Sequence, residues 1–276
     1  MRKCVVLTAV MGMLMVMVAP AAMAEELGVG IDITYADRYV WRGIPINEEA
    51  VLQPSIDLSK GGFNLNAWGN MDLTDWGESD DNPYGDYGDE SGDFTEIDYT
   101  GGYSAEVGKA ILSTGFITYT FPNHTEWGTG LSTTEIFFGL GFDVPLSPSI
   151  TTYIDVDNQG KGGSEGANYT SFDMGHSFEL YSADNMSLGL DFSGHLGYAN
   201  HKFLKFYYGI NEESDFHDWS ASAGLPISLP MGIYITPAYM YTSLMEDESV
   251  DLLDDNTELD TATGIFMVSV GWSGEI

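Results

Sequence analysis

The chain has 276 residues, and its 42 Asp and Glu against nine Lys and Arg give a formal net charge of −33. Such a charge repels the phosphates of nucleic acids, so a protein that reads DNA or RNA is excluded and no nucleic-acid partner is expected. Only 18% of the residues are charged, whereas 43% are hydrophobic and 13% are aromatic. Disordered chains lack aromatic residues at this level, so the sequence predicts a folded protein.

Residues 1–24 have the features of a secretory signal peptide. A basic start, an apolar core and a small-x-small cleavage pattern are provided by Arg2 and Lys3, by Val5 to Val18, and by Ala22-Met23-Ala24. A membrane anchor is the alternative, but the apolar core is shorter than the ~20 residues that a spanning helix needs. We therefore expect export, cleavage before Glu25, and one mature domain over residues 25–276.

The mature chain alternates apolar and polar residues with period two. In the first segment one parity holds Val29, Ile31, Ile33, Tyr35, Tyr39 and Trp41, and the other holds Asp32, Thr34, Ala36 and Arg38. Successive side chains of a strand point to opposite faces, so the segment is a strand with one apolar face. The pattern recurs near residues 52–58, 63–73, 96–104, 111–121, 135–142, 149–157, 168–180, 186–198, 216–229, 232–243 and 262–273. Most of these twelve strands match the ~9 to 11 residues of a tilted transmembrane strand.

The connections between these strands alternate between short and long. The short ones are tight turns near residues 60–62, 107–109, 145–148, 182–185 and 230–232, and the long ones cover about 42–50, 74–94, 122–133, 158–167, 199–215 and 244–261. This organisation is typical of a bacterial outer-membrane barrel with periplasmic turns and external loops. We predict an all-β, antiparallel transmembrane β-barrel of about 12 strands, inserted in outer-membrane lipid by the barrel-assembly machinery.

A secreted soluble β-sandwich is the alternative fold. It does not predict aromatic residues at strand ends, whereas here an interface girdle is expected from Tyr39, Trp41, Tyr119, Phe121, Trp219 and Trp272. In the strand near 111–121, Ile117 and Tyr119 are assigned to the apolar outer face. Asp37 and His176 fall on apolar parity and do not fit, and residues 273–276 are expected to trail past the last strand.

The segment Asp37-Arg38-Tyr39-Val40-Trp41-Arg42-Gly43-Ile44 resembles the TorF family of porins, whose first strand ends in a similar aromatic-Arg-Gly segment. Gln53-Pro54-Ser55-Ile56-Asp57, residues 66–72, 96–99 and 153–157 look like the same family. The resemblance is densest over residues 28–180. It implies an outer-membrane barrel more firmly than it implies transport.

The sequence contains only weak matches to catalytic or metal-binding motifs. Asp191, Ser193 and His195 share one face of a strand, but such neighbours lie ~6.6 to 6.8 Å apart, too far for a serine and its base. The segment 155–160 begins like a calcium loop, yet its twelfth position is Gly166 instead of Glu. Two acidic loops, within 75–93 and 246–260, are solvated charge runs or weak divalent-cation sites. We predict no catalytic, cofactor-binding or metal-binding residue, and no cofactor.

The polar parity of the strands is strongly acidic. The residues predicted to line a pore are Asp32, Arg38, Asp57, Asp72, Glu96, Asp98, Glu135, Asp155, Asp173, Asp191 and His195, with Asp218 on the same parity. Carboxylates in a low-dielectric channel select cations, so we expect a passive diffusion channel for small hydrophilic or cationic solutes. Arg38 is expected to pair with some of the acids and form a constriction, and Arg42 to lie at the outer rim. The alternatives are a structural or adhesive barrel without conductance, and a barrel enzyme such as a lipid hydrolase.

Overall fold

The structure, a computed structural model, describes residues 26–76, 91–122, 131–157, 164–208, 213–245 and 261–276. The predicted signal peptide and most of the two acidic loops lie outside the described residues. Among the residues described, no helix combines the length and the apolar character needed to cross a membrane.

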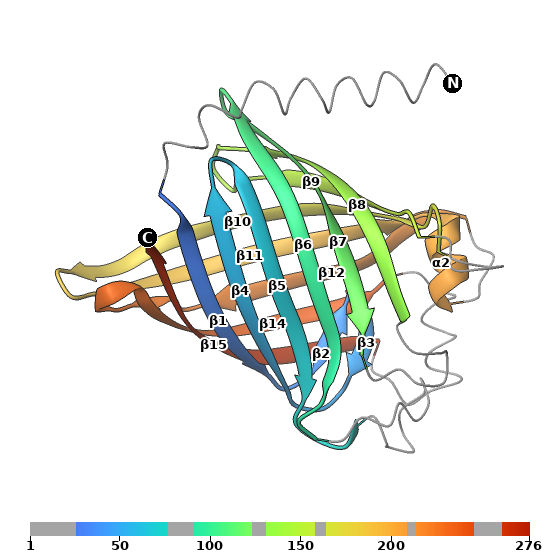
Figure 1. Cartoon of the computed structure of the whole chain (residues 1–276), viewed down its shortest axis with the longest axis horizontal. Coiled ribbons are helices and arrows are strands. Elements are labelled where there is room, and N and C mark those ends of the chain that lie inside the picture. The colour runs from blue at the N-terminus through green and yellow to red at the C-terminus, as the bar shows by residue number, and fades with distance from the viewer. Residues whose placement is uncertain (1–25, 77–90, 123–130, 158–163, 209–212, 246–260) are drawn as a thin grey trace.

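Twelve antiparallel strands form a closed barrel, as the sequence predicted (Figure 1). They are β1 (Gly28–Ala36), β4 (Val51–Lys60), β5 (Phe63–Asp72), β6 (Phe94–Val107), β7 (Ala110–Phe121), β8 (Leu131–Phe142), β9 (Ser149–Asp155), β10 (Asn168–Ala183), β11 (Met186–Ala199), β12 (Asp215–Gly224), β14 (Ile233–Leu244) and β15 (Ala262–Glu275). A short segment, β13 (Ile227–Ser228), continues β12 between β11 and β14. Each strand pairs with its neighbours along the chain, and β1 closes the barrel on β15.

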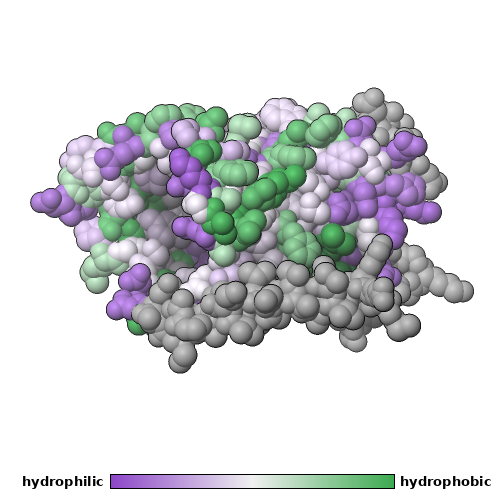
Figure 2. All heavy atoms as spheres, turned by 90° about the horizontal axis from the view of Figure 1, so that it is seen from above, coloured by the Kyte–Doolittle hydropathy of each residue, from purple (hydrophilic) through white to green (hydrophobic). Residues whose placement is uncertain are grey.

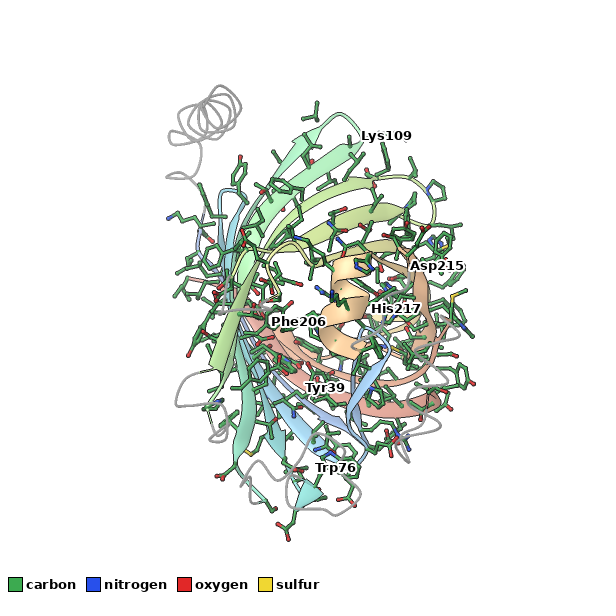
Figure 3. All side chains as sticks on the ribbon, turned by 90° about the vertical axis from the view of Figure 1, so that its right-hand side faces the viewer. Tyr39, Trp76, Lys109, Phe206, Asp215 and His217 are labelled. Atoms are coloured by element: carbon green, nitrogen blue, oxygen red, sulfur yellow. The ribbon has the colours of Figure 1, made fainter. Side chains whose placement is uncertain are left out.

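Two ends of the barrel differ. At the short-turn end, which also carries both ends of the described chain, β4 and β5 are joined by Gly61 and Gly62, and a 3₁₀ turn, η2 (Pro230–Gly232), precedes β14. At the long-loop end, the chain forms a separate hairpin of β2 (Tyr39–Trp41) and β3 (Ile44–Asn47) and a helix, α2 (His201–Tyr208). Figure 3 looks into this end and shows α2 inside the ring of strands.

The barrel has an apolar outer face. Exposed side chains on this face include Ile31, Ile33, Ile56, Leu65, Tyr99, Leu112, Phe116, Phe138, Phe172, Phe192, Tyr239, Phe266 and Val270. Figure 2 shows hydrophobic residues across the middle of one side, with hydrophilic residues toward both ends. His176 also faces outward, where its ring packs edge-on against Phe178 at 4.6 Å.

The assignment of the faces of β7 was wrong. Leu112 and Phe116 are its exposed outer residues, at 48% and 46%, whereas Tyr119 is buried and its hydroxyl donates to Glu135 inside the barrel. Ile117 pairs with Glu135 and so shares this inner face. The interior contains apolar positions as well as polar ones because it is packed against inserted elements, so apolar parity alone did not identify the outer face.

Two further expectations need correction. Tyr39 and Trp41 belong to β2 inside the barrel and not to an outer girdle, because the first predicted strand breaks at a bend after Ala36. Asp37 lies in that bend, where its carboxylate accepts a hydrogen bond from the amide of Phe266. Residues 273–275 do not trail past the last strand, since they pair with β1 out to Gly28.

Candidate functional site

The β2–β3 hairpin turns at Arg42 and Gly43. Trp41 pairs with Ile44, and the two residues between them have φ values of 50° and 77°, as a two-residue type I′ turn requires. A Cβ on Gly43 would lie 2.6 Å from Leu244 and 2.7 Å from Asp218, so the turn packs directly on β14 and β12. A residue other than glycine in the left-handed region costs about 1–2 kcal/mol, which makes Arg42 an unfavourable choice for the turn itself.

The side chain of Arg42 forms a buried ion pair across the lumen. Its Nη1 and Nη2 atoms donate to Oε1 and Oε2 of Glu135 on β8 at 2.8 Å and 2.6 Å. The side chains of Arg42 and Glu135 are 9% and 3% exposed. Burial by itself lowers the pKa of Arg42, but the charge of Glu135 outweighs it and the pKa is raised, so the guanidinium stays protonated. Because both carboxylate oxygens are engaged, bidentate pairing of this kind fixes the orientation of the guanidinium and also neutralises its charge.

Four aromatic rings surround the guanidinium of Arg42. Its Cζ atom lies 4.4 Å from the ring centroid of Trp41, 4.7 Å from Tyr153, 4.4 Å from Tyr169 and 5.9 Å from Phe203. We call these four rings the aromatic cage. They come from β2, β9, β10 and α2, so the cage joins the two inserted elements to the barrel wall.

The hairpin and α2 pack together as a plug in the lumen. Its buried apolar cluster comprises Ile44, Trp76, Ala167, Tyr169, Ala199, Phe203, Leu204, Tyr208 and Leu244. Helix α2 begins after Asn200, whose side-chain oxygen accepts hydrogen bonds from the amides of Phe203 and Asn168. That cap satisfies an amide at the start of α2 and also fixes the helix to β10. We use the word plug for residues 39–47 and 200–208.

A second polar network lies on the wall beside the plug. His195 Nδ1 is 2.6 Å from Asp173, and His195 Nε2 is 2.7 Å from the hydroxyl of Tyr169. Tyr169 also donates to Asp218 at 2.7 Å, and Asp173 accepts from Ser171. The imidazole is therefore held between two acids of neighbouring strands. It is not part of a serine arrangement.

The trio Asp191, Ser193 and His195 is not assembled for catalysis. The hydroxyl of Ser193 lies 2.7 Å from that of Ser222, and His195 is bound to Asp173 instead. Among the described residues, no three His, Cys, Asp or Glu side chains are grouped so that they could hold a metal ion. The loop after Asp155 and the acidic segments within 77–90 and 246–260 lie largely outside the described residues.

The register places the predicted acidic residues on the inner face of the wall. Pairing puts Asp155 beside Glu135, Asp173 beside His195, and Asp98 beside Tyr119. The same face carries Asp32, Asp57, Asp72, Glu96, Asp191 and Asp218. The structure thus gives the positions of these residues on the inner face. Their role in conduction stays a prediction.

Several of these acids are engaged by groups from other elements. The hydroxyl of Tyr39 donates to Glu96, and burial, followed by the nearby charges of Glu96 and Asp98, raises the pKa of Tyr39. Asp155 accepts from Thr133 at 2.6 Å. Arg38 lies in the bend before β2 and donates to Thr263 on β15. Glu135 is bound by Arg42 in a buried bidentate pair inside the lumen. The sequence had placed Arg42 at the outer rim, and that expectation was wrong.

The sequence analysis missed the cage and the plug. Arg42-Gly43 between the apolar residues Trp41 and Ile44 is the available signal, because a residue followed by glycine between two apolar residues can form a two-residue hairpin turn. No comparable sequence signal identifies Phe203. Its role depends on helix α2, which has only eight residues and is too short to show a clear helical periodicity in the sequence.

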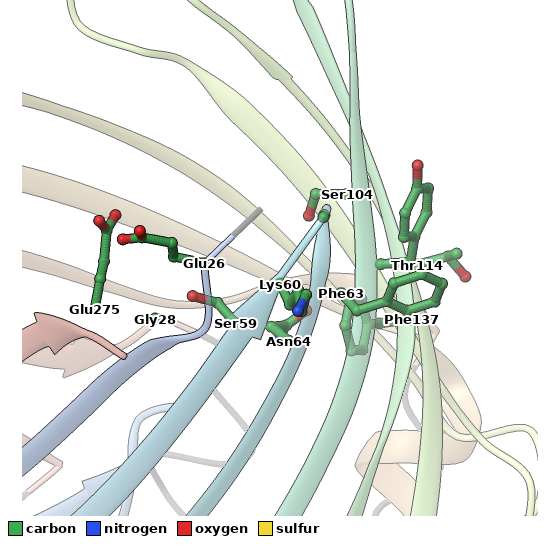
Figure 4. A pocket seen from close by; sticks show the side chains of 13 residues that line it. Glu26, Gly28, Ser59, Lys60, Phe63, Asn64, Ser104, Thr114, Phe137 and Glu275 are labelled. Carbon is green, nitrogen blue, oxygen red and sulfur yellow. The ribbon is translucent and has the colours of Figure 1, made fainter. Parts of the chain in front are cut away.

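The short-turn end of the lumen is hollow. A cavity of ≈630 Å³ has a mixed lining of polar and aromatic residues, which include Ser59, Lys60, Asn64, Phe63 and Phe137 (Figure 4). A second cavity of ≈480 Å³ lies beside it along β6 to β9. Beneath the plug, a third cavity of ≈380 Å³ borders Arg42, three rings of the cage, and Asp173, His195 and Asp218. Space is thus present on both sides of the middle of the lumen.

Comparison with known proteins gives a family and several similar folds. No curated protein sequence matches the chain. Among solved structures, the NanC porin is 12% identical, with a TM-score of 0.44 over 88% of this chain and 98% of the other. An outer membrane channel from Pseudomonas putida F1 is 8% identical, with a TM-score of 0.45 over 90% and 96%. A FadL homologue from Pseudomonas aeruginosa is 14% identical, with a TM-score of 0.38 over 92% of each chain.

A family model matches residues 20–267 of the chain. The matched region includes both elements of the plug and every strand of the barrel, except for the last part of β15. The chain therefore belongs to Gcw_chp, a family of bacterial proteins of unknown function.

Proposed function

We propose that the protein is an outer-membrane channel for passive diffusion of small hydrophilic solutes, that it prefers cations, and that the plug narrows its external entrance. The observation that carries this proposal is a closed barrel with an apolar outer face and an acidic inner face. A closed barrel satisfies all backbone hydrogen bonds between strands, which is the condition for crossing a bilayer without helices. The TorF-like segment Asp37–Ile44 is consistent with this reading.

The charge of the inner face supports the cation preference. The inner positions of the strands that are Asp or Glu include Asp32, Asp57, Asp72, Glu96, Asp98, Glu135, Asp155, Asp173, Asp191 and Asp218. Among the described residues, the Lys and Arg side chains are those of Arg38, Arg42, Lys60, Lys109, Lys202 and Lys205, none of which lies inside the barrel strands away from their ends. His195 is on the inner face of β11, between Asp173 and Asp218. Low-dielectric walls focus the field of such carboxylates into the lumen, which attracts cations and repels anions.

Conductance in planar bilayers tests the proposal. We expect small unitary currents and, in a KCl gradient, a reversal potential of the sign for K⁺ selectivity. The selectivity should fall as salt is raised, because the Debye length shrinks from ~30 Å at 0.01 M to ~3 Å at 1 M. Anion selectivity would contradict the role given to the acidic inner face.

The packed plug favours a second candidate, a structural barrel without conductance. The plug packs on the wall through a buried cluster in which Phe203 and Leu204 of α2 are fully buried and Tyr169 and Leu244 come from β10 and β14. The two candidates differ in one result: a variant that removes plug packing, Phe203→Ala, should conduct if the protein is a plugged channel. No conductance by the refolded wild type and by this variant would assign the protein to the structural class.

The proposed location carries its own test. The chain should fractionate with the outer membrane as a heat-modifiable β-protein, inserted by the barrel-assembly machinery with its apolar face in outer-membrane lipid. Native protein in the soluble periplasmic fraction would contradict the membrane assignment.

A further inference from the structure

The aromatic cage has the composition and geometry of a binding site for an organic cation. Four π-faces lie within 4.4 to 5.9 Å of one guanidinium carbon, inside the ≈6 Å range of cation–π attraction. Glu135 closes one side with both carboxylate oxygens, and the hydroxyl of Tyr119 holds Oε2 of that carboxylate at 2.9 Å. A cage of rings with a fixed carboxylate recognises a planar, positively charged group.

The ligand in the cage belongs to the chain itself. Arg42 reaches the cage from the turn of a hairpin, where its backbone takes a positive φ of 50° that Gly, Asn or Asp would adopt more easily. The hairpin is joined to the barrel wall by a bend at Asp37 and Arg38 and has no strand partner in the barrel sheet. The guanidinium is thus a tethered ligand that the hairpin presents to Glu135, Tyr153 and Tyr169 of the wall. The other two rings of the cage, Trp41 and Phe203, belong to the plug itself.

The cage is reachable from the lumen. The ≈380 Å³ cavity beneath the plug is bordered by Arg42 and by three of the rings, Trp41, Tyr153 and Tyr169. Its other lining groups include Asp173 and Asp218, with His195 between them. A cation that enters this cavity therefore meets three of the cage rings and two carboxylates that share one imidazole.

We propose that the aromatic cage and Glu135 form a binding site for guanidinium-bearing solutes, that the Arg42 side chain occupies this site in their absence, and that such a solute displaces this side chain and breaks the ion pair that joins the hairpin turn to β8. This inference deepens the proposed channel function and rests on it for the route by which the solute arrives. The planar guanidinium is favoured over an ammonium ion because it matches both oxygens of Glu135 and stacks on flat rings. Loss of the ion pair would loosen the turn at Arg42 and Gly43 where it packs on β12 and β14, while Trp41 remains in the cage.

The test measures binding and does not require a current. Methylguanidinium is titrated by calorimetry into detergent-refolded wild type and into Arg42→Ala, with methylammonium as the comparison ligand. We expect Arg42→Ala to bind methylguanidinium about ten- to hundredfold more tightly than wild type, because the tethered competitor is gone. Methylammonium should bind more weakly, and Arg42→Ala combined with Glu135→Gln should lose methylguanidinium binding.

Arg38→Ala is the matched control, since it removes an arginine four residues away and leaves the cage filled. It should bind methylguanidinium as weakly as wild type. Arg42→Lys keeps a positive charge but lacks the planar fork, so its affinity should fall between those of wild type and Arg42→Ala. It also supplies the measurement if Arg42→Ala fails to give a folded, heat-modifiable barrel.

Equal affinity of wild type and of the folded Arg42 variants for methylguanidinium would overturn the inference, and so would equal affinity for methylammonium. Either result would leave Arg42 as a structural cross-link of the plug. Because conductance is measured separately, a conducting wild type without methylguanidinium binding in Arg42→Ala rejects this site and keeps the channel, and the reverse result keeps the site and rejects the channel.

Discussion

The two ends of the lumen are built differently. At the long-loop end, acids are bound by groups from inserted elements, with Glu135 held by Arg42 and Glu96 by Tyr39. At the short-turn end, Asp57 is exposed and accepts from Asn66, and the cavity that it borders is lined mainly by glycine and serine residues. In the channel that we propose, this difference would separate two tasks: the packed end would control what can enter, and the open end would add unpaired carboxylates to the field of the lumen.

The largest expected effect is on the packing of the plug. Phe203 is fully buried in α2, whereas Phe206 on the same helix is 45% exposed. Phe203→Ala should lower the free energy of opening α2 by about 3–5 kcal/mol, because it removes a buried ring and leaves a cavity. Amide hydrogen exchange of the peptide around residues 201–208 measures this.

Phe206→Ala is the control for this variant. It should change the exchange of α2 by about 0.5 kcal/mol or less, since little packing is lost. Equal exchange in the two variants would show that the plug is not held by its buried face.

The next effect concerns the buried ion pair. Glu135→Gln keeps the shape of the side chain but leaves the guanidinium of Arg42 without its counter-charge, which costs about 1–3 kcal/mol. If this free energy biases the plug toward opening, the open probability in single-channel records should rise about five- to 150-fold. Glu106→Gln, at an exposed position of the short-turn end, should leave the open probability at the wild-type level. A fall in open probability in Glu135→Gln would contradict the role of the pair in closing the lumen.

A smaller effect is expected at the start of α2. Asn200→Ala removes the cap and the link to Asn168, for a loss of about 1 kcal/mol. Trypsin should then cleave faster after Lys202 and Lys205. Asn200→Asp retains the accepting oxygen and should be cleaved at a rate close to wild type. Cleavage of both variants at the same raised rate would mean that the amide nitrogen, which donates to Gly166, is the group that matters.

The smallest free-energy effect is on selectivity at the open end. Asp32→Asn with Asp57→Asn removes one half-buried carboxylate, which accepts from Thr34 and Tyr234, and one exposed carboxylate. Each is worth about 1 kcal/mol or less to a nearby cation in water. The reversal potential in a KCl gradient should move toward zero at low salt and change little at high salt. An unchanged reversal potential at low salt would assign cation preference to the packed end instead.

The strands were predictable because their signal is local. Alternation over each strand and turn residues such as Gly61 and Gly62 identify twelve strands, and the closed barrel confirms that count. Parity on its own does not state which face points outward, however. Tyr119 shows this, since an apolar parity that packs against a plug looks the same in sequence as one that faces lipid.

The site was less predictable because it depends on contacts between distant segments. Arg42 and Glu135 are 93 residues apart, and only the folding of the hairpin into the lumen brings them together. His195 and Asp173 meet through the register of β10 and β11, which alternation does not fix. The acidic parity was visible in the sequence, whereas the partners of the individual acids were not.

Closure of the barrel has a consequence for the order of folding. Strands β1 and β15 pair along their length, from Gly28 with Glu275 to Ala36 with Met267, and the amide and carbonyl groups of Leu27 and Ile276 bond to each other beyond that. One edge of β1 pairs with β4, and its other edge therefore has no partner until β15 has been synthesised. Contacts of such long sequence separation form slowly, and until they form both margins expose unpaired hydrogen-bonding groups. The nascent chain thus depends on protection from aggregation for as long as this last pairing takes.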